Sequence, residues 1–311
     1  MNDAAGPSPA RYMAHRATRL LLVGGGDVAF RTLALLPRGW QVTAFVRPGP
    51  QAARLRSAGV RVVVGDLDDR TTLARLSGRT DRIIYSAPPA SDTDGEPRLR
   101  RTLAALSGSR LPRSLVYIST SGVYGDHGGS LVSETALLRT ASPRARRRVA
   151  AERLLRRWGR DTGVATAILR APSIYAADRL PVARIRAGAP AIEATEDSYS
   201  NHIHADDLAR ACVLALFRAR GGRAFNVCDD APLRMGDYFD AVADRFGLPR
   251  PPRLPRDLVR ARVDPMLWSF MAESRQLDNR RARRELRLRL RYPTVASFLE
   301  TTDAAVPNTS P

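Results

Sequence analysis

Lysine is absent from this sequence of 311 residues: all 50 basic side chains are arginine, and with 31 acidic residues they give a net charge of +19. A charge of this size can indicate nucleic-acid binding. Arginine is, however, spread along the whole chain, which indicates a coding bias, and no aromatic-rich reader motif accompanies it. The densest clusters, at 144–148, 156–160 and 280–291, are expected on solvated faces of helices. The sequence therefore argues against nucleic acid as a partner.

Cysteine is also scarce, and long apolar runs are missing. Cys212 and Cys228 form no CxxC pair and have no histidine nearby, so we predict no metal site and expect two buried thiols in a reducing compartment. No stretch approaches the roughly 20 apolar residues of a membrane span. Residues 1–15 are polar, lack the apolar core of a signal peptide, and are expected to be disordered. We therefore expect a cytoplasmic protein without a membrane segment.

Short aliphatic runs alternate with helix-like segments through the first half of the chain. Strands are predicted at 20–23, 41–46, 60–64, 82–86, 115–119 and 166–169, and helices at 27–36, 51–58, 71–76, 99–106 and 144–158. This alternation predicts an α/β protein with a doubly wound parallel sheet of the Rossmann type. Runs such as LLLV and VRVVV fit strands that are buried on both faces.

The rhythm changes after Arg170. A helix is predicted at 206–217, a strand at 224–227, and a proline-rich connector at 249–255. We therefore predict a Rossmann domain at 16–172, a smaller C-terminal substrate lobe at 173–302 with elements that return to the sheet, and a polar tail at 303–311.

The turn after the first strand reads GGGDVA, from Gly24 to Ala29. In a G-x-G-x-x-A turn between a strand and a helix, the first glycine makes the tight turn, the second lets a pyrophosphate approach, and the last small residue packs the helix on the strand. Gly24, Gly26, Asp27, Val28 and Ala29 fit this pattern. Because the helix N-terminus also favours phosphate, we predict a dinucleotide site here.

The residue at the end of the second strand indicates which ribose, that of NAD or that of NADP, the site prefers. An acidic residue about 20 positions after the glycines is typical of NAD sites, whereas an arginine suits the 2′-phosphate of NADP. Arg47 stands 21 residues after Gly26. The sequence therefore favours NADP, with NAD as the alternative.

Further segments resemble the extended short-chain dehydrogenase/reductase family, also called the NAD-dependent epimerases/dehydratases. The resemblance rests on Asp66-Leu67 and Ser86-Ala87 after the third and fourth strands, on VYISTSGVYGD at 116–126, on LRAPSIY at 169–175, and on HIHADDL at 202–208. It runs from about residue 20 to residue 299. It implies that Asp66 and Leu67 contact the adenine and that Ser86 and Ala87 line the cofactor site.

The same resemblance implies roles in catalysis and substrate binding. Thr120 takes the place of the catalytic hydroxyl, with Ser119 and Ser121 as neighbours that could share the role, and Tyr124 is either structural or substrate-facing. We predict Thr120, Ser121 and Tyr124 as catalytic residues. Arg170, Tyr175 and Asn201 are the predicted substrate contacts.

One family feature is missing. The YxxxK pair of the family should precede Glu152, but Arg144 stands in the tyrosine place and Arg148 in the lysine place. Arg148 could still bind the cofactor ribose, whereas a guanidinium such as that of Arg144 does not exchange a proton near neutral pH. With the ESRQLDNRR segment at 273–281, this departure resembles an atypical subgroup that keeps the cofactor fold without the usual pair.

Other groups could supply the proton. Asp126 and His127 follow the VYG turn, and Tyr199 comes from the second lobe. His204, at the start of a predicted helix, is expected to be structural.

Two functions follow from these patterns. The first is an NAD(P)-binding oxidoreductase or epimerase that acts by hydride transfer on a small polar or sugar-like substrate. The second is a non-catalytic NADP-binding sensor or scaffold, which the missing pair favours. The family commonly dimerises through its fourth and fifth helices, so the resemblance leaves a homodimer open.

Overall fold

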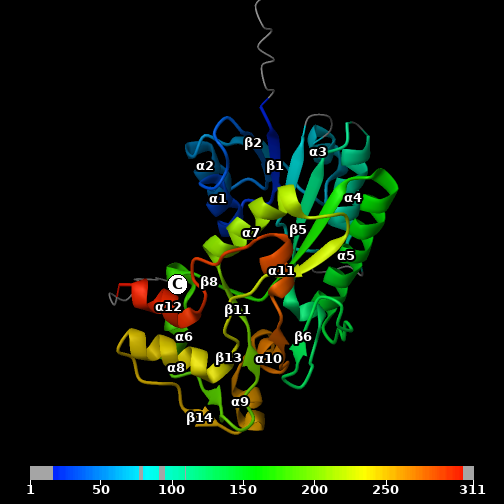
Figure 1. The fold of residues 1–311 in the computed structure, drawn as a ribbon. Coiled ribbons are helices and arrows are strands. Elements are labelled where there is room, and N and C mark those ends of the chain that lie inside the picture. The colour runs from blue at the N-terminus through cyan, green and yellow to red at the C-terminus, as the bar shows by residue number, and fades with distance from the viewer. Residues whose placement is uncertain (1–16, 77–79, 91–94, 109, 304–311) are drawn as a thin grey trace, which may run out of the picture.

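A computed structural model describes residues 17–76, 80–90, 95–108 and 110–303, so the segment 1–15 and nearly all of the predicted tail lie outside the described residues. A parallel seven-stranded sheet forms the centre of the upper part of the molecule in Figure 1. Its order is β12 (Arg223–Asn226), β7 (Ala165–Ala171), β5 (Ser114–Thr120), β4 (Arg82–Tyr85), β1 (Arg19–Val23), β2 (Gln41–Val46) and β3 (Arg61–Val64). The predicted Rossmann-type α/β fold is confirmed.

Alternating side chains of each strand enter two different cores. In β1, Leu20 and Leu22 face one side of the sheet, whereas Leu21 and Val23 face the other, and all four are buried. The first side is covered by α1 (Asp27–Leu33), α2 (Pro50–Ser57), α7 (Ala205–Arg218) and α11 (Arg280–Glu285). The second is covered by α3 (Arg70–Leu73), the 3₁₀ turn η1 (Ala74–Leu76), α4 (Pro97–Ser107) and α5 (Pro143–Thr162). Both faces of the sheet are therefore buried under helices, which explains the continuous aliphatic runs.

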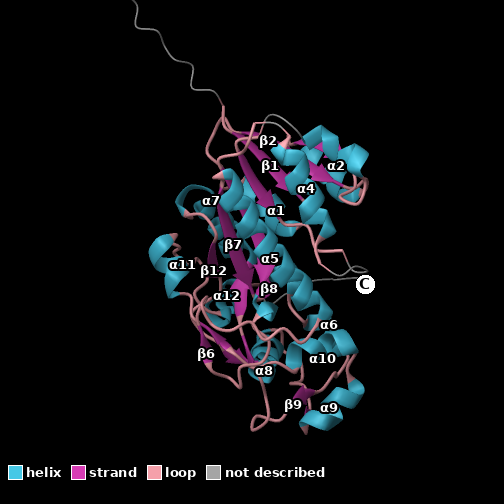
Figure 2. Cartoon of the chain, turned by 90° about the vertical axis from the view of Figure 1, so that its right-hand side faces the viewer, coloured by secondary structure: helices cyan, strands magenta, loops and turns pink. Residues whose placement is uncertain are grey.

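A smaller lobe lies beyond the carboxyl ends of the strands in Figures 1 and 2. Its helices are α6 (Val182–Arg186), α8 (Met235–Arg245), α9 (Arg256–Arg262), α10 (Pro265–Met271) and α12 (Val295–Thr301). Its strands are short: β8 (Ser173–Tyr175) with β11 (His202–His204), β9 (Ala191–Ile192) with β14 (Arg253–Leu254), and β10 (Tyr199–Ser200) with β13 (Leu233–Arg234). α6, α8 and α12 share one apolar cluster of their own.

Two further pieces connect the lobe with the sheet. β6 (Leu131–Val132) pairs in parallel with β15 (Gln276–Leu277), and the 3₁₀ turns η2 (Ser121–Val123) and η3 (Ala177–Arg179) follow β5 and β8. The second half of the chain also contributes β12 to the sheet, and α7 and α11 to the helices that cover one of its faces.

Two segments of the second half can be compared with the sequence expectation. The arginine cluster at 280–291 was expected on one helix, but α11 ends at Glu285 and Arg287 has a left-handed φ of 52°. This break lets both Leu286 and Leu288 enter the core. The connector at 249–255 is not helical, as predicted, although it contains the two residues of β14.

None of the helices in the described residues is long and apolar enough to cross a membrane.

Candidate active site

The turn after the central strand β1 is built from three glycines. Gly24 has a φ of +99°, and a Cβ added there would lie 2.8 Å from Oγ of Ser86, so the turn requires glycine. A Cβ on Gly25 would lie 2.8 Å from Cγ1 of Val46. Gly26, the N-cap of α1, has no atom within 4 Å of an added Cβ. The fold therefore needs the first two glycines, whereas Gly26 leaves open space beside the start of α1.

A cavity of about 560 Å³ opens at the carboxyl ends of β1, β2, β3 and β4. This edge of a doubly wound sheet is where ligands bind. The predicted cofactor residues that line the cavity are Gly24, Gly26, Arg47, Asp66, Leu67, Ser86 and Ala87. The structure thus brings together predicted residues from four separate turns.

Charged groups at the far end of this cavity suit a ribose and a base. Arg47 is exposed directly after β2, and its guanidinium forms no hydrogen bond or ion pair within the described chain. The Oδ1 atom of Asp66 accepts a hydrogen bond from the backbone N of Asp68 at 2.9 Å. Arg98 also lines the cavity and pairs with Asp68 at 2.6 Å. No sequence pattern pointed to Arg98, because its partner lies 30 residues earlier in the chain.

The other predicted cofactor residues of the loop do not line this cavity. Val28 and Ala29 are buried between α1 and the sheet, where they pack in the core. The carboxylate of Asp27 accepts a hydrogen bond from Nε of Arg31 at 2.7 Å, and Arg31 also pairs with Asp206 of α7 at 2.6 Å. These side chains therefore position the first turn of α1.

A second cavity, of about 620 Å³, lies between the end of β5 and the smaller lobe. Thr120, Ser121 and Asn201 are the predicted catalytic and substrate residues that line it. The hydroxyl oxygen of Thr120 accepts a hydrogen bond from the backbone N of Gly122 at 3.2 Å. A hydroxyl can donate one hydrogen bond while it accepts another, so the hydroxyl of Thr120 is still able to donate a hydrogen bond to an acceptor in the cavity.

The side chains of two polar residues, Asn201 and Ser119, form hydrogen bonds within the protein. The side-chain amide of Asn201 donates to the backbone O of Arg275 at 2.9 Å and accepts from the backbone N of Leu277 at 2.8 Å. Asn201 therefore shapes the cavity wall. The hydroxyl of Ser119 is buried and donates to Oε1 of Glu152 at 2.7 Å, so it does not share the role of Thr120.

The two arginines that the motif resemblance assigned to the YxxxK places, Arg144 and Arg148, lie one turn apart on α5. Arg144 lines the second cavity, and its guanidinium carbon lies 4.5 Å from the centre of the Phe270 ring. Burial and the nearby charge of Arg148 lower the pKa of Arg144. Arg148 donates from Nη1 to the hydroxyl of Tyr117 at 2.8 Å and to the backbone O of Ile118 at 2.9 Å. Its remaining donors have no acceptor in the described part of the chain.

Three predicted site residues lie elsewhere, which corrects the sequence analysis. Tyr124 is fully buried: its hydroxyl donates to Oδ1 of Asn226 at 2.6 Å and accepts from Nη1 of Arg170 at 2.8 Å, and burial raises its pKa to about 12. Arg170 is 2% exposed and binds Glu152. Tyr175 is 1% exposed and packs among aromatic rings. None of the three lines the cavity.

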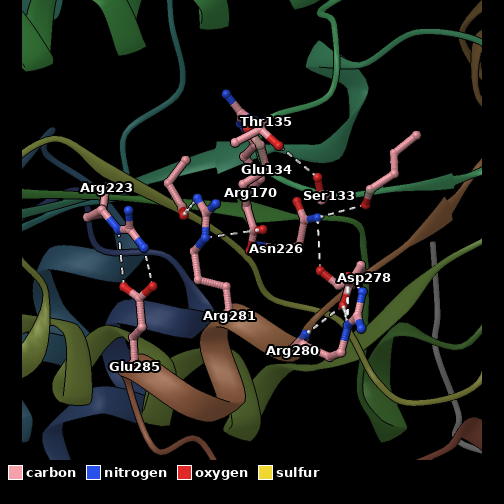
Figure 3. A network of polar contacts seen from close by, with 12 residues as sticks. Ser133, Glu134, Thr135, Arg170, Arg223, Asn226, Asp278, Arg280, Arg281 and Glu285 are labelled. Carbon is pink, nitrogen blue, oxygen red and sulfur yellow. Dashed lines mark hydrogen bonds and ion pairs between the residues drawn. The ribbon is translucent and has the colours of Figure 1, made fainter.

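Figure 3 shows the network to which Arg170 belongs. Arg170 donates to the backbone O of Glu134 at 3.1 Å, and Oε1 of Glu134 accepts from the backbone N of Asn226 at 2.9 Å. The Nδ2 atom of Asn226 donates to the backbone O of Asp278 at 3.1 Å. Arg281 pairs with Glu134 at 3.4 Å. The ESRQLDNRR segment, which contains Asp278 and Arg281, therefore fastens β6 to β12.

Of the alternative proton donors named from the sequence, Tyr199 lines the cavity, whereas Asp126 and His127 do not. Asp126 accepts from the backbone N of Ser274 at 2.8 Å, and Nε2 of His127 contacts the backbone O of Leu137 at 3.1 Å. His204 is the N-cap of α7: its Nδ1 accepts from the backbone N of Asp206 at 3.2 Å, and burial lowers its pKa to about 4. The prediction that His204 is structural is confirmed.

Several lining residues were not among the predicted catalytic or substrate residues, although Tyr199 was named as an alternative proton donor and Arg144 as the residue in the tyrosine place. The ionisable ones are Arg144, Arg179, Tyr199, Glu273 and Arg275. Glu273 pairs with Arg275 at 2.7 Å, and Arg275 also donates to the backbone O of Gly125 at 2.8 Å. Tyr199 lines the cavity, and its hydroxyl has no hydrogen-bond partner among the residues that the structure describes. These groups come from segments far apart in the chain, so no local pattern links them.

The sequence model of the NAD dependent epimerase/dehydratase family matches residues 30–228. The chain therefore belongs to this family, as the motifs predicted. No curated protein matches the sequence.

Similar solved structures share the fold over nearly the whole chain. A protein from Silicibacter pomeroyi, described as functionally unknown, is 29% identical with a TM-score of 0.76, covering 92% of this chain and 98% of its own. A nucleoside-diphosphate-sugar epimerase from Pseudomonas aeruginosa is 21% identical with a TM-score of 0.75, covering 91% and 95%. UDP-glucuronic acid 4-epimerase from Bacillus cereus, solved in complex with NAD, is 19% identical with a TM-score of 0.71, covering 91% and 96%.

Proposed function

We propose that this protein is an NAD(P)-dependent oxidoreductase or epimerase that acts on a small polar, sugar-like substrate. The observation that carries the proposal is the pair of cavities at one edge of the sheet: one is lined by the glycine turn and the other by Thr120. Bound nicotinamide supplies a hydride acceptor or donor. The family assignment supports this chemistry.

The described residues fit a dinucleotide. Gly26 leaves open space beside the N-terminus of α1, where a pyrophosphate would approach the backbone amides. Asp66 and Leu67 would bind the adenine, and Ser86 and Ala87 would line the middle of the site. Arg47 would bind a 2′-phosphate, so we propose NADP as the preferred cofactor. Arg148 would donate to the ribose hydroxyls.

On the substrate side, Thr120 would donate a hydrogen bond to the oxygen on the reacting carbon. The proton of that oxygen needs an acceptor, because Arg144 cannot serve as one. Tyr199 is our candidate, since it lines the same cavity and its hydroxyl has no partner in the described chain. A phenol can pass a proton between a substrate oxygen and water.

The proposal is tested by titrating the protein with NADPH and NADH by calorimetry, and then by following NAD(P)H absorbance with a panel of sugar and carbonyl substrates. We expect saturable NADPH binding and turnover of at least one substrate that Thr120→Ala removes. Tight cofactor binding with no turnover across the panel would count against an enzyme.

A non-catalytic sensor or scaffold is the second candidate. It is favoured by Arg144, which occupies the family's tyrosine place with a group that does not exchange protons. This role requires that a partner binds differently to the NADPH-loaded and the cofactor-free protein. Any substrate turnover that depends on Thr120 would exclude it.

A further inference from the structure

Among the arginines that line the second cavity, Arg144 is the one whose guanidinium has no ion-pair partner in the described residues. It forms no hydrogen bond or ion pair with any residue that the structure describes, and only its flat face is used, against the ring of Phe270 at 4.5 Å. Arg275, by contrast, is paired with Glu273 at 2.7 Å. The planar donor edge of Arg144 is therefore available to a ligand in the cavity.

The surroundings of Arg144 favour a negative ligand. The lining residues include three arginines, Arg144, Arg179 and Arg275, but a single carboxylate, Glu273, which is already paired. Arg144 also stands in the first turn of α5, a helix of 20 residues whose N-cap is Ser142. The positive end of the helix dipole adds to the attraction.

Hydroxyl groups line the same cavity. Thr120, Ser121 and Ser142 lie on its wall together with Arg144. An oxyanion that accepts two parallel hydrogen bonds from a guanidinium is fixed in orientation as well as in position. Such a group would place a neighbouring carbon and its oxygen against Thr120.

We propose that Arg144 binds an oxyanion of the substrate, a carboxylate or a phosphate, so that the substrate is an acid. This inference rests on the proposed function and names its substrate class. It explains why an arginine stands in the family's tyrosine place: the position binds charge there and does not exchange a proton.

The test compares three sugars of similar size: glucose, glucuronate and glucose 1-phosphate. Each is titrated by calorimetry into the full chain, with and without NADPH, in a phosphate-free buffer. We expect one of the two acids to bind ten- to a hundredfold more tightly than glucose, because charge-assisted hydrogen bonds are the strong ones. The preferred acid distinguishes a carboxylate from a phosphate.

Three variants assign the effect to Arg144. Arg144→Gln should remove the preference for the acid, and Arg144→Lys should keep part of it. Arg146→Gln is the matched control, because it removes the same charge from the same helix, but Arg146 does not line the cavity and donates to the backbone O of Ala141. Thermal melting of each variant checks the fold.

The outcomes separate this inference from the proposed function. Equal binding of all three sugars, no saturation by either acid, or an equal loss in Arg146→Gln would overturn the inference. If an acid binds through Arg144 but NADPH does not bind, the inference stands and the proposed function fails. If NADPH binds and no acid is preferred, the proposed function stands alone.

Discussion

Arg170 and Glu152 form a two-point ion pair in the interior of the protein. The Nη2 atom of Arg170 lies 2.7 Å from Oε2 of Glu152, and its Nε lies 3.1 Å from Oε1. Both side chains are at most 3% exposed. Because Glu152 also accepts from Ser119 and Arg170 donates to Tyr124, the pair joins α5, β5 and β7 behind the second cavity.

This pair predicts a large loss of stability when it is broken from one side. Glu152→Ala leaves the charge of Arg170 buried without a partner, which should lower the free energy of unfolding by about 3–5 kcal/mol. Urea unfolding measures it. The double variant Glu152→Leu/Arg170→Met should regain most of the loss. Arg156→Gln is the control, because its pair with Glu152 is partly exposed and should cost about 1 kcal/mol or less. A Glu152→Ala variant as stable as the wild type would contradict the assignment.

The sequence predicted the sheet well because local patterns determine it. The aliphatic runs of β1 and β3, and the glycines after β1, carry their meaning within a few residues. The lobe was predicted only in outline, because its helices have mixed faces and its strands have two or three residues each. Such short strands depend on pairing partners far away in the chain, as in β6 and β15, whose paired residues Leu131 and Gln276 are 145 positions apart.

The site was predicted unevenly for a related reason. Residues at the carboxyl ends of sheet strands were placed by the strand pattern, such as Thr120, which ends β5, and Gly24, which follows β1. Tyr124 and Arg170 were expected to face the substrate, but burial and mutual hydrogen bonds turn both into core residues. Tyr199 was named from the sequence as one of several alternative proton donors, whereas Arg275 lines the cavity through tertiary packing that a single sequence does not reveal.

The glycine turn predicts a contrast between two alanine variants. Gly26→Ala should fold normally, since a Cβ there meets open space and the φ of −70° suits alanine. Its methyl group would occupy the space proposed for the pyrophosphate, so NADPH affinity should fall by tenfold or more in calorimetry. Gly24→Ala should instead destabilise the protein itself, by about 1 kcal/mol or more, because its φ is +99°. Unchanged NADPH binding in Gly26→Ala would refute the proposed position of the diphosphate.

Arg47 predicts a change in cofactor preference. Arg47→Gln should weaken NADPH binding by about ten- to a hundredfold, the value of one charge-assisted hydrogen bond, and leave NADH binding nearly unchanged. Arg56→Gln, an exposed change of equal charge on α2, is the control and should affect neither cofactor strongly. Parallel titrations with both cofactors measure the ratio. An equal loss for NADH and NADPH in Arg47→Gln would exclude a contact with the 2′-phosphate.

His202 predicts acid sensitivity. Its ring is fully buried against Tyr238, and burial lowers its pKa from 6.5 to about 3. Between these two values the unfolded chain binds a proton that the folded chain does not, so the free energy of unfolding falls as pH falls. The contribution is about 2 kcal/mol between pH 6.5 and pH 5.

The variant His202→Phe isolates this effect. Its stability relative to the wild type should improve steadily as pH falls below 6.5 in urea unfolding curves. Asp229, whose pKa burial raises to about 8, acts in the opposite sense and is present in both proteins, so it cancels in the difference. A difference that does not change with pH would show that His202 is not buried in its neutral form.

The hydroxyls of the second cavity predict how catalysis divides between two residues. Thr120→Ala should lower kcat/KM by about a hundredfold or more, because the hydrogen bond that it would donate strengthens as charge develops on the substrate oxygen. Thr120→Ser keeps the hydroxyl and should retain most of the activity. Tyr199→Phe should lower kcat with little change in substrate affinity, since it deletes a proton-transfer group. If Tyr199→Phe leaves kcat unchanged, another group must move the proton, and water is then the next candidate.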